Sequence, residues 1–357
     1  MRKISATILV YPYPWYSERL LHKDVYQFPD AIARALKNEM KVLKGCLITG
    51  QERDGQSPIM LRAALLLNVL LLLLRLPTLR LSSQAKTPCF VFFHISWPTA
   101  LLAGAVRLIW RERARIVVKT DLNPNSELAT SDGGSILERF SVRTLRPISD
   151  FLATETLGAV QALYRLFDPR QVILCRNGID LSSVSHLDSP LRDIDVLVVS
   201  RFFVEKKGAV LYKEVIPQLV QAGLSVHLIG EGAEQFASSM ALSGNARLRV
   251  SEQLQHADVL RAMRRARVFL SLSLSESFLI AIMEAHAMGC RVIATAVGVA
   301  PDLAKETSGI TIVPFNADNI VPQVLQGLGQ AQPIAPARLG GWDDVVEDSG
   351  LIRQLTQ

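Results

Sequence analysis

The chain has 357 residues, of which 49% are hydrophobic and 20% charged, and its formal net charge is +6. This composition excludes an intrinsically disordered chain, and the length exceeds what one hydrophobic core usually supports, so two globular domains are expected. The positive charge would suit nucleic acid, an anionic membrane surface or a phosphorylated substrate, and it does not choose among them.

Short apolar segments alternate with helix-like segments along the chain. The first six apolar segments are interpreted as strands: Ala6–Val10, Val42–Thr49, Cys89–His94, Arg115–Lys119, Phe151–Thr154 and Gln171–Cys175. Six more follow: Val196–Ser200, Ser225–Ile229, Arg247–Val250, Val268–Leu272, Arg291–Thr295 and Ile310–Val313. This rhythm predicts an α/β protein with two Rossmann-like domains, each a doubly wound parallel sheet with helices on both faces.

The domain boundaries follow from the same pattern. Residues 1–180 are expected to form the N-terminal domain and residues 194–330 the C-terminal domain. Residues 181–193 carry a proline, several serines and no sustained period, which is typical of a linker. Residues 331–357 form a final segment with a helix expected at Trp342–Leu355. Because parallel sheets bind ligands at the carboxyl ends of their strands, the site is expected in a cleft between the domains.

The most apolar run, Ala63–Leu74, is bracketed by Arg62 and Arg75 and interrupted by Asn68. A bilayer span needs about 20 apolar residues, so a buried or interfacial helix is expected here. A core helix that covers a sheet is the favoured interpretation, and contact with an anionic membrane is left open. The first residues lack the features of a secretory signal peptide, so a cytoplasmic protein is expected.

Two strand ends of the second half carry residues suited to a diphosphate. Arg201 and Lys207 lie in a basic loop after the strand Val196–Ser200 and could pair with phosphate oxygens, Arg as a fork and Lys as a point charge. Gly230 and Gly232 follow the next strand and would let a ligand approach the backbone closely. A solvated basic turn and an ordinary turn are the alternatives for these two segments taken singly.

The segment after the strand Val268–Leu272 places two glutamates eight residues apart. Glu276 is expected in the turn before a helix and Glu284 about two turns inside it, where each carboxylate could accept hydrogen bonds from hydroxyls. The backbone N–H groups at the start of that helix would form an anion site. The residues expected there are Ser277, Phe278, Leu279 and Ile280. The alternatives are a charge that favours the helix dipole for Glu276 and an exposed helix position for Glu284.

Together these segments resemble the donor site of retaining glycosyltransferases of family 4. The residues that carry the resemblance are Glu276-x7-Glu284 with Ala285 and Gly289, then Arg291–Thr295 and Gly298–Leu303, and, earlier in the chain, Asn177–Asp180, Ser200–Arg201 with Lys207–Gly208, and Gly230–Gly232. The resemblance spans roughly residues 171–314. It departs from the family at Leu279 and Val299, where glycine is usual, and both side chains are expected to crowd the donor sugar.

The resemblance implies a GT-B fold in which two Rossmann-like domains face a cleft and the second holds a nucleotide-sugar. It also implies transfer with retention, without a metal or any cofactor. Arg201 and Lys207 would neutralise the departing diphosphate, Glu276 would hold the donor sugar, and Glu284 would bind the ribose. The end of the chain would return to the first domain.

The first domain resembles the family less. Asp121 follows the strand Arg115–Lys119 and is the best candidate there to orient an acceptor hydroxyl, with Lys119 beside it. His94 also lies at a strand end, and a structural role suits it equally. Tyr13 belongs to an aromatic loop that could stack on an acceptor sugar or simply pack.

These expectations combine into one function. The chain is expected to be a cytoplasmic hexosyltransferase that moves a sugar from a nucleoside-diphosphate sugar to a glycan or lipid-linked acceptor. The resemblance to the family implies a role for the protein in cell-surface polysaccharide or lipopolysaccharide synthesis. The alternatives are an epimerase or phosphorylase of the same fold, and a donor-binding partner subunit without activity. Nucleic acid is not an expected partner, because no basic strip with interleaved aromatic residues is present.

Overall fold

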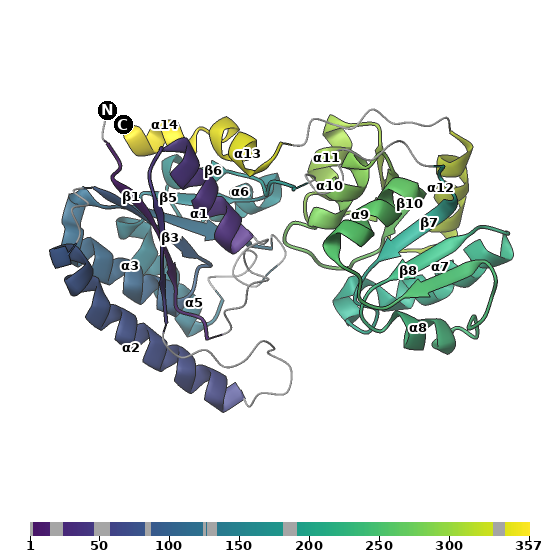
Figure 1. Ribbon diagram of the computed structural model, residues 1–357, viewed down its shortest axis with the longest axis horizontal. Helices are drawn as coiled ribbons and strands as arrows, with labels where there is room; N and C mark the ends of the chain where they lie inside the picture. Colours follow the sequence, from purple (N-terminus) through teal and green to yellow (C-terminus); the bar gives the residue numbers. More distant parts are fainter. Residues whose placement is uncertain are drawn as a thin grey trace. The chain divides into compact units, whose positions relative to one another are not determined.

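The computed structural model describes residues 3–14, 24–45, 58–82, 87–123, 126, 134–180, 191–330 and 340–357. The chain divides into two compact units, one of residues 1–178 with 340–357 and the other of residues 179–339. Each unit has a six-stranded parallel sheet with helices on both faces (Figure 1). The predicted fold class is therefore confirmed, and the cleft between the units stays a prediction. The expected linker lies mostly outside the described residues.

The sheet of the first unit has the strand order β2-β1-β3-β4-β5-β6, with every neighbouring pair parallel. Its strands are β1 (Ala6–Tyr11), β2 (Met40–Lys44), β3 (Pro88–Phe93), β4 (Arg115–Thr120), β5 (Phe151–Thr154) and β6 (Val172–Leu174). Its helices are α1 (Asp24–Ala35), α2 (Pro58–Ser82), α3 (Trp97–Trp110), α5 (Ile136–Ile148), α6 (Leu157–Leu163), α13 (Trp342–Asp348) and α14 (Leu351–Thr356).

Successive side chains of these strands point to opposite faces of the sheet. Phe90 and Ile116 belong to one core cluster with residues of α2, α3 and α6, whereas Val91 and Val117 belong to a second with residues of α1, α13 and α14. Because both faces of the inner strands β1, β3 and β5 are buried, these strands are continuous apolar runs rather than alternating patterns.

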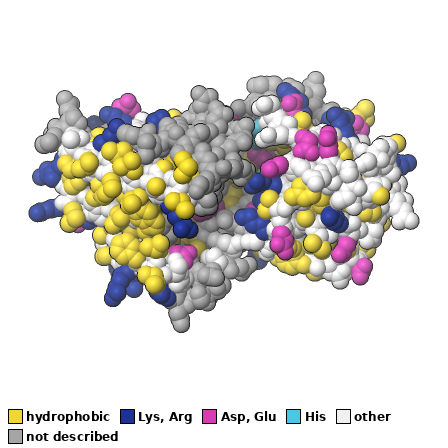
Figure 2. Space-filling model, turned by 90° about the horizontal axis from the view of Figure 1, so that it is seen from below, with side chains coloured by type: hydrophobic (Ala, Val, Ile, Leu, Met, Phe, Trp, Pro, Cys, Tyr) yellow, Lys and Arg dark blue, Asp and Glu magenta, His cyan; other side chains and the backbone are white. Residues whose placement is uncertain are grey.

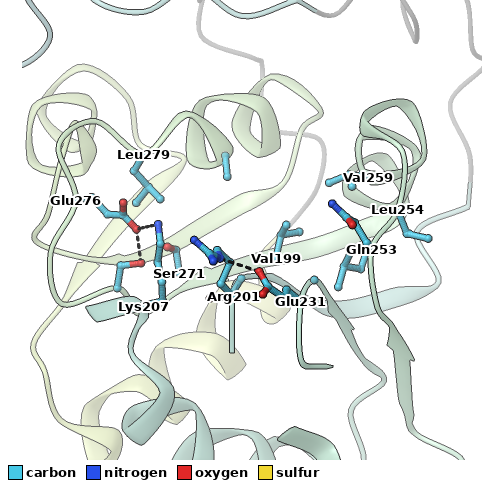
Figure 3. Close-up of a pocket in the computed structure, with 15 residues that line it drawn as sticks. Val199, Arg201, Lys207, Glu231, Gln253, Leu254, Val259, Ser271, Glu276 and Leu279 are labelled. Atoms are coloured by element: carbon cyan, nitrogen blue, oxygen red, sulfur yellow. Dashed lines mark hydrogen bonds and ion pairs between the residues drawn. The ribbon is translucent and has the colours of Figure 1, made fainter. Parts of the chain in front are cut away.

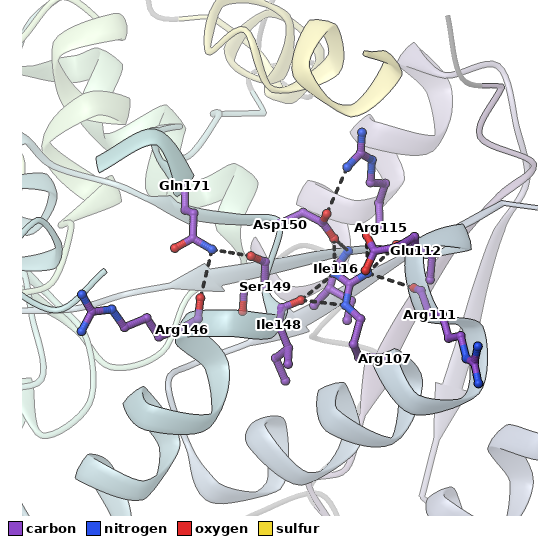
Figure 4. A network of polar contacts seen from close by, with 11 residues as sticks. Arg107, Arg111, Glu112, Arg115, Ile116, Arg146, Ile148, Ser149, Asp150 and Gln171 are labelled. Atoms are coloured by element: carbon purple, nitrogen blue, oxygen red, sulfur yellow. Dashed lines mark hydrogen bonds and ion pairs between the residues drawn. The ribbon is translucent and has the colours of Figure 1, made fainter. Parts of the chain in front are cut away.

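A carboxylate just before β5 ties helix α3 to the sheet (Figure 4). Asp150 accepts hydrogen bonds from Arg107 Nη2 at 2.7 Å, from Arg115 Nη1 at 3.0 Å and from the backbone N–H of Ile116 at 2.7 Å. Side chains of Arg107 and Asp150 are 17% and 12% exposed, so this network is largely shielded from water. It fixes the spacing between α3 and β4, the strand that carries Lys119.

The sheet of the second unit has the order β12-β11-β10-β7-β8-β9, again all parallel. Its strands are β7 (Ile194–Val199), β8 (Val226–Ile229), β9 (Leu248–Ser251), β10 (Ala266–Ser271), β11 (Arg291–Thr295) and β12 (Ile310–Val313). Its helices are α7 (Ala209–Gln221), α8 (Ala233–Ser239), α9 (His256–Arg265), α10 (Ile280–Ala287), α11 (Ala300–Glu306) and α12 (Ala317–Gly329). Side chains of α7, α8 and α12 share one core cluster, and those of α9, α10 and α11 share the other.

All twelve predicted strands are present, with ends displaced by a few residues. The largest shift is at β2, which runs from Met40 to Lys44; residues 46–49 of the expected strand lie outside the described residues. The single helix predicted at Trp342–Leu355 is wrong, because Gly350 with φ 74° separates α13 from α14. Both helices pack on the first unit's sheet through buried residues such as Val346 and Leu355.

Helix α2 is longer than the apolar run suggested. It has 25 residues, and the part Ile59–Arg80 is long and apolar enough to cross a membrane by length and composition alone. Only 28% of its most apolar window is buried. The favoured interpretation of a core helix therefore holds for one face of α2 and is wrong for the other.

Candidate functional site

A cavity of about 460 Å³ lies at the carboxyl ends of β7, β8 and β10 in the second unit (Figure 3). This is the edge at which open parallel sheets bind ligands. The polar side chains that line it come from the predicted segments and from neighbouring loops: Ser200, Arg201, Lys207, Glu231, Gln253, Ser271, Ser273 and Glu276. Five of the predicted donor residues thus share one cavity: Arg201, Lys207, Gly230, Glu276 and Leu279.

Lys207 and Glu276 form the central pair of this cavity. Lys207 ends a short 3-10 helix (Glu205–Lys207), and its Nζ donates to Glu276 Oε1 at 2.6 Å. The same oxygen accepts from Ser273 Oγ at 2.7 Å. Side chains of Lys207 and Glu276 are 25% and 12% exposed, so the pair is partly shielded from solvent. The carboxylate is thereby held in one orientation while the ammonium keeps further donors for a ligand.

Two glycines allow the loops of the site to approach the strand ends. At Gly208, with φ 84°, an added Cβ would lie 1.9 Å from the Leu272 carbonyl oxygen. At Gly230, with φ 135°, it would lie 1.9 Å from the carbonyl oxygen of Ser200. Gly232, also predicted to bind the donor, does not line the cavity; its N–H donates to Glu252 at 2.8 Å. This hydrogen bond stabilises the turn after β8, so the N–H of Gly232 is not directed at a ligand in the cavity.

Arg201 reaches the cavity from the loop after β7. Its Nε donates to Glu231 Oε2 at 2.9 Å, and the two side chains are 56% and 65% exposed. Exposed pairs of this kind are worth roughly 0–1 kcal/mol, so a bound anion can compete for the guanidinium. Glu231 lies between the two predicted glycines, but the sequence alone did not indicate its pairing with Arg201.

The start of α10 differs from the sequence expectation in detail. Leu279 is the N-cap residue with φ 79° and ψ 64°, a left-handed conformation that favours glycine, and it lines the cavity. The side chain of Phe278 is buried in the core, and its backbone carbonyl accepts a hydrogen bond from the N–H of Val299 at 2.8 Å. Neither Ser277 nor Ile280 lines the cavity. Of the two, only Ile280 contributes its backbone N–H to the open first turn of the helix, because Ser277 precedes the N-cap residue.

Val299 does not crowd the cavity, so this expectation was wrong. Its side chain is 0% exposed within the core cluster of α9, α10 and α11, and it is absent from the cavity lining. Its φ of −82° is ordinary for a residue with a side chain. Of the two departures from the family pattern, only Leu279 therefore faces the cavity.

Glu284 lies outside the lining of the cavity, on the second turn of α10. It is 9% exposed, and its Oε1 is 2.7 Å from Nε2 of His256, the first residue of α9. The hydrogen bond to Glu284 raises the pKa of His256 above its ordinary value. His256 was not predicted from the sequence, although its position soon after β9, at the ligand-binding edge of the sheet, was a usable signal.

The predicted residues of the first unit gather at the carboxyl ends of β3 and β4. His94 Nδ1 lies 2.7 Å from Asp121 Oδ1, and Tyr13 packs edge-on against His94 with ring centroids 5.8 Å apart. His94 adopts φ 64°, a strained conformation for a residue other than glycine. Burial lowers the pKa of His94, but the hydrogen bond and charge of Asp121 outweigh it, so the pKa is raised.

Lys119 points away from solvent. It is 1% exposed, and its Nζ donates to the Cys175 carbonyl at 2.6 Å and lies 3.6 Å from Glu155 Oε1. Burial raises the pKa of Glu155 to about 7, with Lys119 acting in the opposite direction. The prediction that Lys119 contacts an acceptor is therefore wrong, because its ammonium is buried and joins the end of β4 to the Cys175 carbonyl after β6.

Comparison with known families bears on the second unit. Residues 193–330 match the model of the glycosyl transferases group 1. That segment contains the whole cavity and both glutamates. Over 172 residues the chain is 31% identical to a component of the human phosphatidylinositol N-acetylglucosaminyltransferase, and over 199 residues 26% identical to the Arabidopsis thaliana protein of the same name. These matches cover 46% and 52% of the chain but only 34% and 44% of the relatives.

Solved structures agree with the whole chain in fold. Sucrose-phosphate synthase from Thermosynechococcus elongatus superposes with a TM-score of 0.65 at 14% identity, covering 99% of this chain and 95% of the other. The Anabaena protein Alr3699/HepE, solved with UDP and glucose, gives 0.63 at 13% identity, covering 98% and 97%. The UDP-GlcNAc 2-epimerase of Methanocaldococcus jannaschii gives 0.59 at 12% identity, covering 98% and 99%. The fold is that of the GT-B glycosyltransferases, and at these identities it does not decide the reaction.

Proposed function

We propose that the protein is a glycosyltransferase that transfers a sugar from a nucleoside-diphosphate sugar to a glycan or lipid-linked acceptor, with retention at the anomeric carbon and without a metal. The observation that carries the proposal is the joining of Lys207, Ser273 and Glu276 by two short hydrogen bonds in a cavity of the glycosyltransferase-matched segment. The proposal keeps the cytoplasmic setting expected from the sequence, with surface-polysaccharide synthesis as its pathway class.

The proposed chemistry follows from the charges of the cavity. The acceptor hydroxyl oxygen bonds to the anomeric carbon as the bond from that carbon to the diphosphate oxygen breaks. Negative charge grows on the leaving diphosphate, and the freed diphosphate oxygen takes up the proton of the acceptor hydroxyl. Lys207 and Arg201 would meet that charge in a partly dry site, where such stabilisation is often the largest catalytic term. Glu276 would accept hydrogen bonds from the sugar hydroxyls and so keep the sugar ring oriented relative to the leaving diphosphate.

The first test is thermal stabilisation by UDP-glucose, UDP-N-acetylglucosamine, ADP-glucose and GDP-mannose, because a ligand that binds only the folded protein raises its melting temperature. The stabilising donor is then incubated with the protein and EDTA, and free nucleoside diphosphate is measured. Release of nucleoside diphosphate in EDTA supports a metal-independent transferase. Stabilisation without any release, with glycan and glycolipid acceptors, would instead indicate the donor-binding partner subunit.

The epimerase alternative rests on the shared fold of the Methanocaldococcus jannaschii enzyme. It makes a different prediction for the same incubation, because an epimerase returns a nucleotide-sugar of changed configuration and needs no acceptor. Proton nuclear magnetic resonance of the anomeric region distinguishes that product from the starting donor. The protein is expected to leave the configuration of the unreacted donor unchanged.

Removing the carboxylate of Glu284 is expected to weaken nucleotide binding. Loss of a charged acceptor for the paired ribose hydroxyls should raise the dissociation constant of UDP about tenfold to a hundredfold in Glu284→Gln. Isothermal titration calorimetry measures it. His256→Gln is the matched control, since it removes the partner of Glu284 and leaves the carboxylate; its effect should stay below that of Glu284→Gln. Equal UDP affinity in the wild type and Glu284→Gln would remove Glu284 from the donor site.

Shortening Leu279 is expected to change which donors are accepted. Glycine suits the left-handed conformation of this position and withdraws a side chain from the cavity. The ratio of kcat/KM for UDP-N-acetylglucosamine over UDP-glucose should rise about tenfold in Leu279→Gly, the scale of steric discrimination in an apolar pocket. Val299→Gly is the control: it lies in the core, so it should lower stability without moving the ratio. An unchanged ratio in Leu279→Gly would contradict the assignment.

A further inference from the structure

Between Arg62 and Arg75, the exposed residues of α2 are all apolar. The helix carries a stripe of large, exposed hydrophobic side chains, which we call the apolar stripe: Ile59, Met60, Leu66, Leu67, Leu70 and Leu74, each 44% to 77% exposed. Most of them recur at intervals of three to four residues, so they share one side of the helix. Figure 2 shows hydrophobic side chains gathered on this face of the first unit, with basic side chains around them. An exposed apolar area of this kind marks an interaction site.

The opposite face of α2 is part of the core. Asn68, Leu72 and Leu76 are 0% exposed, and Val69 is 1% exposed. Leu72 and Leu76 belong to the cluster that also holds Phe90 of β3. A membrane-spanning position would pull these residues out of that cluster and leave the sheet uncovered. The helix therefore has the length of a span but is held at the surface of a folded unit, which fits a helix lying in the plane of an interface.

The charged side chains of α2 and α3 all have one sign. The sequence contains no Asp or Glu between Asp54 and Glu112, a stretch that includes all of α2 and α3. Arg62, Arg75 and Arg80 are exposed on α2. Arg75 and Arg80 donate to the backbone carbonyls of Lys44 and Ile109, which places their guanidinium groups beside the helix. Basic side chains flanking an apolar stripe complement the headgroups of anionic lipids.

We infer that α2 docks the first unit onto an anionic lipid bilayer, with the apolar stripe inserted among the acyl chains at the surface and the arginines at the headgroups. The inference does not depend on the reaction catalysed by the second unit. It selects a lipid surface over a protein partner because an exposed apolar stripe accompanied by arginines matches both layers of a bilayer surface, hydrocarbon and anionic headgroup.

The test is co-sedimentation of the full chain with vesicles. Binding is expected to vesicles of phosphatidylcholine and phosphatidylglycerol in equal parts and to be weaker to phosphatidylcholine alone. The double variant Leu70→Gln and Leu74→Gln keeps helix-forming residues and should lower the partition coefficient about tenfold. The double variant Val210→Gln and Leu325→Gln alters comparably exposed residues, 60% and 44%, of the second unit and should bind as the wild type does.

A further variant separates the effect of charge from that of hydrophobicity. Arg62→Gln should reduce binding to the mixed vesicles about fivefold, the effect of one basic group, and leave binding to phosphatidylcholine unchanged. Circular dichroism melting confirms that each variant is folded. Three results would overturn the inference: equal vesicle binding by the Leu70/Leu74 variant and the wild type, retention in the membrane after alkaline extraction as for a spanning helix, or a stable dimer in solution that the Leu70/Leu74 variant dissociates.

Discussion

Replacing Glu276 with alanine is expected to lower kcat for sugar transfer by a factor of about a hundred to a thousand. That is the loss seen when one preorganised contact to a reacting centre is removed, about 3 to 4 kcal/mol in the barrier. Nucleotide binding should be kept, because the change frees Lys207 from its 2.6 Å contact and leaves its full charge for the diphosphate. Steady-state kinetics with the donor that stabilises the protein, and calorimetry with UDP, measure both quantities.

Two controls sharpen this expectation. Glu276→Gln can still accept from Ser273 and retains the shape of the side chain, so any loss it shares with Glu276→Ala reports the charge. Glu214→Ala removes an exposed carboxylate on α7, remote from the cavity lining, and should change neither kcat nor UDP affinity. If Glu276→Ala turns over as fast as the wild type, the carboxylate does not hold the donor sugar. If UDP affinity collapses instead, its role is in the folding of the loop.

Replacing Gly230 with alanine is expected to unfold the second unit or to destabilise it by more than about 3 kcal/mol. The new Cβ would lie 1.9 Å from the Ser200 carbonyl oxygen, a backbone atom, so the collision cannot be relieved by turning a side chain. The ends of β7 and β8 would have to separate, which would also open the cavity. Urea unfolding followed by circular dichroism gives the free energy, and UDP binding should be lost with it.

Gly244→Ala is the matched control for that change. Gly244 has φ 75° but nothing lies within 4 Å of an added Cβ, so only the conformational strain of a side chain is introduced. Its cost should be about 1 to 2 kcal/mol. Equal destabilisation by the two substitutions would mean that the close approach of Gly230 to Ser200 contributes nothing.

Much of the fold was predictable because its signals are local. Strands buried on both faces, such as β1 and β3, are apolar runs whatever their neighbours, so they could be placed from the sequence. The edge strand β2, which has no fully buried residue, showed the largest displacement. The helix ends were less predictable: Gly350 divides the final helix through a left-handed conformation that a periodic pattern does not reveal. The burial of helix α2 was predicted wrongly. An apolar run shows that a helix has few polar side chains, but it does not show which face of the helix is covered by the rest of the protein.

The candidate site shows the same division. Its motif residues Arg201, Lys207 and Glu276 were named from residue types at strand ends, and the parallel sheet brings them to one cavity. The pairs that set their chemistry join residues far apart in the chain: Lys207 with Glu276, and His256 with Glu284. No local pattern encodes such a pair, since it depends on the register of neighbouring strands.

The sequence by itself determined the two-sheet architecture, the order of its strands along the chain and five of the residues that line the cavity, because hydrophobic periodicity and strand-end chemistry are properties of short segments. Only the tertiary structure decided that Leu279 faces the cavity while Val299 is packed in the core, that Lys119 is buried, and that one face of α2 is uncovered. Those outcomes depend on which distant elements pack against each residue. The exposure of a side chain is therefore fixed only by the packing of helices and strands against one another.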